Sequence, residues 1–432
     1  MSKTNIIIII NILLKLIFTE KLFKVPFKFY STSSFFPNQS HPVTNKFMSE
    51  IIIPIAIGNP PQKFNASLKL NSYHTVILSE DLPGIQLNKY FNKSLSSSYT
   101  CIKNNSIYFN EDFQMAETFS DNFQIFSNST LFFQNKFYLL LVRGLAYNVP
   151  NEFYTSGTIG LRLRSFASNQ EDSKKKFTYQ IKENGLSENE IFTFQFEGDD
   201  GYFIIGKNAF NNSNYLSINT GVMPMKFTGL EWSFNFDFVV YGNEQLESKN
   251  TLLKNEIGLF VGPTDYENKV FEKFFKNNTK CYRNSTKMGY ATFKYYYCDE
   301  DVDVNQMDNL VFGLNQINYN FTFSGKELFY EENKKKYFKI VFLLSNNPYW
   351  FFGREFLKKY QLYFDMARKL IYIPLNKEEN KKNYYSIFHI CITIVLGISV
   401  IALIFYIFRY LKKYPRKKRA NELEDDFDYI IQ

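Results

Sequence analysis

Two short segments that each begin with a lysine, Lys69-Leu70-Asn71 and Lys254-Asn255-Glu256, hold the residues with the clearest chemical potential. A lysine ammonium group donates hydrogen bonds but has no lone pair, so it acts as a base or nucleophile only when deprotonated. Two ammonium groups about 4 Å apart repel by about 4 kcal/mol at an effective dielectric constant of about 20, which favours loss of one proton. Glu256 offers the alternative chemistry, an ion pair with either lysine that plugs the space between the segments.

The elements that must position these segments are predicted to be mostly β-strands. From about residue 45 to about residue 375, apolar, aromatic and β-branched runs alternate with Asn, Gly and Asp clusters. The predicted strands are 51–57, 132–142, 192–196, 202–205, 232–241 and 369–374, and the helical patterns are 268–276 and 354–360. Asp199-Asp200-Gly201 is a hairpin turn signal. This β-rich region of roughly 330 residues is large enough to divide into two lobes.

Composition gives no reason to expect a nucleic-acid partner. The formal net charge is +8, but the lysines are spread along the chain. The short runs at 174–176 and 334–336 lie in polar stretches and are typical of solvated loops.

The N-terminal end has the layout of a signal peptide. Lys3 precedes an apolar run at 6–18 that is too short to span a bilayer comfortably. We therefore predict a signal peptide at 1–20, with an uncleaved anchor as the alternative because Lys15 interrupts the run.

Residues 387–408 contain no Asp, Glu, Lys or Arg and are long enough to cross a hydrocarbon core. A block of seven lysines and arginines follows between 409 and 419. The positive-inside rule then predicts a single-pass type I membrane protein, with a transmembrane helix at 387–408 and a cytosolic tail at 409–432.

This topology places Cys101, Cys281 and Cys298 in an oxidising compartment, the secretory lumen or the outside of the cell. Cys281 and Cys298 are close in sequence and are the predicted disulfide, although other pairings among the three stay open. The same region permits N-glycosylation at nine Asn-x-Ser/Thr matches, which begin at Asn38, Asn65, Asn92, Asn104, Asn128, Asn211, Asn277, Asn284 and Asn320.

Six motifs in consistent order resemble those of the pepsin-like aspartic peptidase family. The first, residues 55–64, is similar to the family pattern I-x-I-G-T-P-P-Q-x-F. The others are 156–161, 192–206, 232–242, 262–264 and 350–365. The resemblance covers about residues 46–375 and implies two β lobes, 46–220 and 221–376, with a deep cleft between them. Residues 21–45 then form either a propeptide remnant or a linker.

The family carries one Asp-Thr/Ser-Gly loop in each lobe, and a second element with two apolar residues and a Gly braces each loop. Counting from the flanking motifs places the two loops at Lys69-Leu70-Asn71 and Lys254-Asn255-Glu256, and the braces at Thr158-Ile159-Gly160 and Phe351-Phe352-Gly353. No Asp-Thr-Gly or Asp-Ser-Gly occurs in the chain. The family mechanism needs two carboxylates that share one proton and hold a water molecule. The resemblance therefore implies a member without its catalytic carboxylates.

The neighbours of the two lysines also differ from the family pattern. Leu70 and Asn255 replace threonines whose hydroxyls bond across the loops, and Asn71 and Glu256 replace glycines. Phe109 takes the place of the tyrosine in the hairpin that closes over the substrate. The cleft candidates are Lys69, Asn71, Phe109, Lys254 and Glu256, with Phe36, Arg162 and Arg164 as residues that could fill the cleft. The resemblance implies no cofactor and no metal.

Three functions fit these observations. The chain is a pseudopeptidase that binds an extended peptide or protein in its cleft, an active aspartic-type endopeptidase if the register is wrong or lysine chemistry operates, or a structural surface glycoprotein with a filled cleft. Peptidase activity separates the second hypothesis from the other two.

Overall fold

The computed structural model of the chain describes residues 23–31, 41–82, 90–106, 113–127, 130–145, 155–163, 174–198, 200–206, 215–220, 231–247, 249–288, 291–375 and 409. The predicted signal peptide, most of the hairpin at 107–113, the membrane span at 387–408 and nearly all of the tail lie outside these residues. Among the helices in the described part, none combines the length and hydropathy needed to cross a bilayer.

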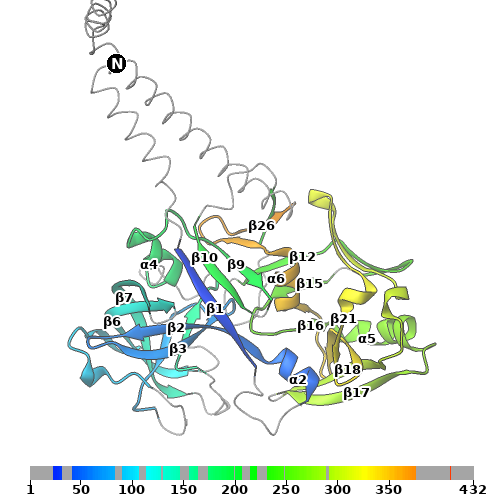
Figure 1. Cartoon of the computed structure of the whole chain (residues 1–432), viewed down its shortest axis with the longest axis horizontal. Coiled ribbons are helices and arrows are strands. Elements are labelled where there is room, and N and C mark those ends of the chain that lie inside the picture. Colours follow the sequence, from blue (N-terminus) through cyan, green and yellow to red (C-terminus); the bar gives the residue numbers. More distant parts are fainter. Residues whose placement is uncertain are drawn as a thin grey trace, which may run out of the picture. The chain divides into compact units, whose positions relative to one another are not determined.

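The largest sheet contains thirteen of the described strands, which confirms the prediction of a mostly β fold (Figure 1). In spatial order they are β11 (Tyr215–Asn219), β26 (Leu370–Pro374), β25 (Tyr363–Asp365), β9 (Ile191–Glu197), β10 (Asp200–Ile205), β1 (Phe23–Ser31), β2 (Ser49–Ile57), β3 (Gln62–Lys69), β8 (Gly157–Gly160), β4 (Val76–Leu78), β7 (Thr130–Leu145), β6 (Phe113–Ser127) and β5 (Thr100–Ser106).

Two smaller sheets contain the remaining described strands. The first runs β12 (Ser233–Asn235), β15 (Asn250–Leu253), β24 (Trp350–Phe352), β16 (Phe260–Gly262), β23 (Ile340–Leu343), β18 (Ala291–Asp299), β22 (Lys335–Phe338) and β21 (Phe329–Glu332), and β17 (Cys281–Met288) pairs with β18. The second runs β14 (Glu244–Leu246), β13 (Phe238–Tyr241), β19 (Leu310–Leu314) and β20 (Tyr319–Phe323).

Helices are short in the described part of the chain. The α-helices are α2 (Pro42–Phe47), α4 (Phe177–Glu183), α5 (Glu267–Val270) and α6 (Arg354–Tyr360). The helical pattern at 354–360 is confirmed by α6, and the pattern at 268–276 is shared between α5 and a π-helical turn, η5 (Phe271–Phe275). The 3₁₀ turns are η3 (Lys93–Leu95), η4 (Thr264–Tyr266), η6 (Val304–Gln306), η7 (Asn315–Ile317) and η8 (Gly325–Leu328). The sequence analysis missed α4, whose Phe177 and Ile181 are fully buried.

An ordinary linker is the wrong interpretation of residues 23–31. These residues form β1, which pairs antiparallel with β10 on one side and with β2 on the other (Figure 1). Val25 and Phe27 are almost completely buried in the main core. The alternation of Phe, Val and Phe with Lys in this stretch is the period-two pattern of a strand that has one buried face.

The next described residues are also packed into the folded region. Val43 and Phe47 of α2 belong to a buried cluster with residues of β16, β18 and β23. The guanidinium of Arg354 donates hydrogen bonds to the carbonyl and the hydroxyl of Ser49, just after α2. Residues 41–49 are therefore anchored to strands that come much later in the chain.

The boundary predicted between two lobes at 220/221 does not divide the sheets. β25 and β26 fall in the predicted C-terminal lobe, yet β25 pairs with β9 and β26 pairs with β11 in the largest sheet. Trp232, which is fully buried, packs against Phe192 of β9 and Phe364 of β25. The aromatic core is continuous across the predicted boundary because these rings come from both sides of it.

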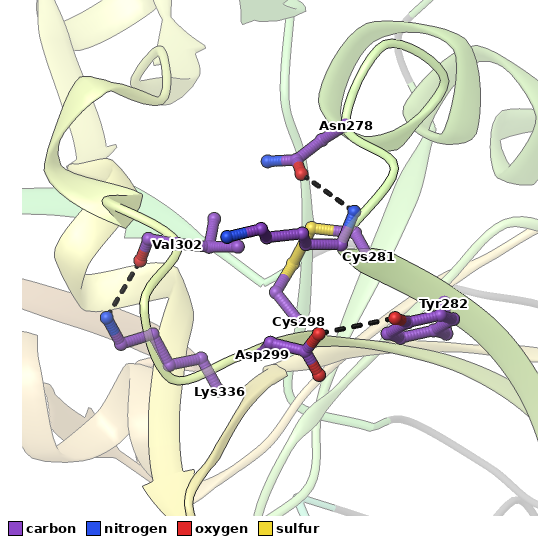
Figure 2. The surroundings of a disulfide bond; sticks show 8 residues. Asn278, Cys281, Tyr282, Cys298, Asp299, Val302 and Lys336 are labelled. Carbon is purple, nitrogen blue, oxygen red and sulfur yellow. Dashed lines mark hydrogen bonds between the residues drawn. A yellow bond between two sulfur atoms is a disulfide. The ribbon is translucent and has the colours of Figure 1, made fainter.

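The predicted disulfide between Cys281 and Cys298 is present. The two cysteines lie directly opposite each other on β17 and β18, and Tyr282 and Asp299 beside them form a hydrogen bond (Figure 2). Cys101 is exposed and forms no disulfide in the described part of the chain.

Removing the disulfide through a Cys281→Ser/Cys298→Ser double substitution is expected to reduce the free energy of unfolding by about 3 kcal/mol, because the bridge closes a short loop and restricts the unfolded chain. Urea unfolding of the full chain measures this loss. Cys101→Ser is the matched control and should leave stability unchanged. Equal stability of the double variant and the wild type would contradict the prediction.

Candidate functional site

Lys69 is the last residue of β3, and its backbone is fixed by β8. The two strands are parallel, with Lys69 opposite Gly160, and the amide of Leu161 donates to the Lys69 carbonyl at 2.9 Å. A Cβ atom on Gly160 would lie 2.5 Å from the carbonyl carbon of Tyr73 and 2.6 Å from the carbonyl oxygen of His74. Only glycine allows this approach, so the predicted brace at 158–160 holds the loop after Lys69.

Lys254 has an equivalent position in the second sheet. It directly follows β15, which is parallel to β24, and its amide donates to the Phe352 carbonyl at 2.9 Å. A Cβ atom on Gly353 would lie 2.3 Å from the Leu259 carbonyl oxygen and 2.4 Å from that of Ile257. The predicted brace at 351–353 therefore supports the loop after Lys254 in the same way.

A single side chain, Asn255, joins the two loops. Its Oδ1 accepts a hydrogen bond from the Leu70 amide at 2.8 Å, and its Nδ2 donates to the Leu68 carbonyl at 2.7 Å. Asn255 is fully buried, so neither bond competes with water. Leu70, also buried, has no polar side-chain atom to return the contact. The structure thus brings Lys69 and Lys254 together, because each is the neighbour of a residue in this link.

Lys69 has a carboxylate partner that the sequence analysis did not name. Its Nζ lies 2.9 Å from Oε1 of Glu50, and both side chains are largely buried. β2 pairs antiparallel with β3, with Ile52 opposite Ser67, so continuing the register by two residues puts Glu50 opposite Lys69. The pair is a cross-strand ion pair of opposite charges. The sequence signal was present as a lone acidic residue at the start of an apolar strand.

Lys254 is held differently. Its Nζ lies 4.8 Å from the centre of the Phe351 ring, a cation–π distance. No carboxylate in the described part of the chain lies within ion-pair distance of this ammonium group. Lys254 is also partly exposed, so its charge is available to solvent or to a ligand.

Glu256 differs from the predicted ionic plug. Its Oε2 atom is buried and has no hydrogen-bond partner among the described residues. Burial raises the pKa of the Glu256 carboxyl, and this outweighs the opposing effects of Lys254 and Lys69. The negative charge of Glu231 raises the pKa further. The neutral acid is therefore favoured in the folded chain relative to an exposed glutamate.

A second buried ion pair lies beside these residues. Arg162 follows the first brace, and its guanidinium lies 3.2 Å from Oε1 of Glu231, with both side chains 9% exposed. The indole of Trp232 donates to the Leu161 carbonyl at 2.7 Å. Arg162 was predicted to be able to fill the cleft. It forms an ion pair with Glu231, which lies beyond the predicted lobe boundary.

Of the other predicted site residues, Asn71 is half-buried in the turn after β3. Phe109, Phe36 and Arg164 lie outside the described residues. The sequence analysis did not assign Asn255 its linking role, although it placed Asn255 where the resembling family has a bonding threonine.

The chain was compared with known proteins. A family model described as eukaryotic aspartyl protease matches residues 50–374. No curated protein matches the chain.

Asn255→Ala should lower the free energy of unfolding by roughly 3 kcal/mol, because it leaves the Leu70 amide and the Leu68 carbonyl buried without partners. Asn255→Thr keeps one acceptor and one donor and should lose less. Urea unfolding of the full chain compares them, with the exposed Asn305→Ala as control. If the Asn255→Ala chain has the same free energy of unfolding as the wild type, the hydrogen bonds of Asn255 do not stabilise the fold.

The raised pKa of Glu256 makes stability depend on pH. The folded chain binds this proton more tightly than the unfolded chain, so the free energy of unfolding falls as pH rises above the ordinary value of 4.5. Glu256→Gln removes this dependence and should gain stability relative to wild type between about pH 5 and pH 8. Urea unfolding across that range measures the difference. An ion-paired plug gives the opposite result, a variant less stable than wild type at neutral pH.

Proposed function

The chain belongs to the eukaryotic aspartyl protease family, and we propose that it is a member without peptidase activity that retains peptides in its cleft. One observation carries this proposal. Lysines stand at the ends of β3 and β15, on two braced loops that a buried side chain joins. By the family resemblance, these are the positions of the two catalytic aspartates.

The chemistry of the lysines supports inactivity. Amide hydrolysis by this family needs one carboxylate to take a proton from water while the other donates a proton to the scissile carbonyl. An ammonium group cannot accept that proton. Glu256 and Glu50 do not restore the pair, because Glu50 is bound to Lys69 and burial raises the pKa of Glu256.

The proposed ligand is an extended segment of peptide or protein, because a cleft between β lobes suits a strand-like occupant. The argument from fold is one of analogy. What supports binding in this chain is the preservation of both braces and of a cross-loop link after the acids have gone.

The proposed setting is a type I membrane glycoprotein with its folded region in the secretory lumen or outside the cell. The apolar run at 387–408 and the basic block behind it support this orientation. The disulfide fits an oxidising compartment. Among the described residues, four of the Asn-x-Ser/Thr matches have exposed asparagines: Asn65, Asn277, Asn284 and Asn320.

The purified full chain is expected to leave a mixed peptide library intact at both acidic and neutral pH, since it lacks the carboxylate pair. Mass spectrometry of the library measures cleavage, with an active aspartic peptidase as positive control. Cleavage that a pepstatin-like inhibitor abolishes would show that the family chemistry operates. Cleavage that disappears in a Lys69→Met/Lys254→Met chain would instead indicate lysine chemistry. An intact library with no retained peptide would favour the structural glycoprotein.

A further inference from the structure

Among the described residues around the two loops, one cation has no ion-pair partner. Lys69 is bound by Glu50 at 2.9 Å and Arg162 by Glu231 at 3.2 Å, so both of these positive charges are locally compensated. Lys254 has no such partner in the described part of the chain, and burial raises the pKa of its nearest carboxyl group along the chain, Glu256. Of these three cations, Lys254 is therefore the one whose charge no ion pair among the described residues compensates.

The Lys254 ammonium group is suited to binding an anion. The centre of the Phe351 ring lies 4.8 Å from it and restricts the long side chain, and the ammonium group has three N–H donors. A lysine that is already restrained loses less conformational entropy when a ligand binds. The partial exposure of Lys254 leaves a route from solvent to this charge.

Glu256 provides a second, independent sign that the site is incomplete. Buried polar atoms in native proteins nearly always have a hydrogen-bond partner, yet Oε2 of Glu256 has none among the described residues. A neutral carboxyl group carries an O–H donor in addition to its acceptor oxygen. Beside Lys254, it can thus offer a donor to the same acceptor that the ammonium group attracts.

We propose that this site selects ligands with a carboxylate group, which accepts hydrogen bonds from Lys254 and Glu256 at the place where the family holds its catalytic water. The inference rests on the proposed function and narrows its ligand class to extended peptides that present a carboxylate group. One carboxylate neutralises the single uncompensated charge, and its oxygens have lone pairs enough for both donors. The carboxylate can come from an Asp or Glu side chain or from a free C-terminus.

The experiment uses the full chain and three pools of fluorescent extended peptides that are otherwise matched. The first has a central Glu and an amidated C-terminus, the second a central Gln and an amidated C-terminus, and the third a central Gln and a free C-terminus. Fluorescence anisotropy measures each dissociation constant. We expect at least one carboxylate pool to bind about tenfold or more tightly than the Gln-amide pool, because hydrogen bonds to charged groups are the stronger ones. Which carboxylate pool binds identifies its source.

Lys254→Met and Lys254→Gln test the assignment to this residue. Both should reduce the preference for carboxylate pools to near unity, while Lys276→Met, an exposed lysine elsewhere, should keep it. Thermal unfolding confirms that each variant is folded, and two different substitutions guard against a local packing defect.

Each outcome decides between the two proposals. If all three pools bind equally, the carboxylate site is wrong while peptide retention stands. If no pool binds, peptide retention itself is wrong. If both Lys254 variants keep the carboxylate preference, the selecting cation is not Lys254.

Discussion

The amide of Asn255 is the constraint on which the geometry of the site depends. It satisfies a buried N–H and a buried C=O of the opposite loop, two backbone groups that would otherwise lie in the interior without partners. A side chain with both a donor and an acceptor is needed, and Asn provides them in one planar group. The Asn255 side chain forms both hydrogen bonds of this link, because the Leu70 side chain has no polar atom with which to form one. The β3 loop is therefore held by the second sheet, but its own side chain adds only apolar packing in return.

The lysines at the ends of these two strands need neighbouring groups that compensate their positive charges. A buried or half-buried charge is costly unless an opposite charge or hydrogen bonds compensate it. Glu50 provides this for Lys69 across the β2–β3 pair, and Glu231 provides it for Arg162. Lys254 lies instead against the face of Phe351 and stays partly exposed, so its charge is accessible.

Much of this site followed from spacing in the sequence. Counting from strand and turn motifs placed each loop beside a glycine brace, and in the structure Lys69 lies opposite Gly160 and the Lys254 amide binds the Phe352 carbonyl. Glu50 could not be found in this way, because its contact with Lys69 depends on the register between two strands rather than on either motif. The partners of Arg162 and Arg354 come from distant segments, and no local pattern identifies them.

For the fold as well, contacts between distant segments could not be predicted from local sequence patterns. Apolar, aromatic and β-branched runs predicted β2, β7, β9, β10 and β26, and the pattern of 354–360 predicted α6. The predicted strand at 232–241 is divided between β12 and β13, and most of the described strands were not predicted. Apolar and polar residues alternate at 23–31 as in a strand. Their position between the predicted signal peptide and the first family motif nevertheless favoured a propeptide remnant or a linker. Sheet membership is decided by which exposed backbone edges remain to be paired, and this information is spread over the whole chain.

The central place of β1 has a consequence for how the protein is made. Its two neighbours, β2 and β10, are separated by most of the strands of the largest sheet, and β25 and β26 join that sheet only at the end of the folded region. Contacts between such distant segments close slowly, because chain entropy is lost before they form. During synthesis, one edge of β1 stays unpaired until β10 has been made, and β9 and β11 stay without β25 and β26 until the end of the folded region. Such an unpaired edge is a template for pairing with another chain until its own partner strand is present.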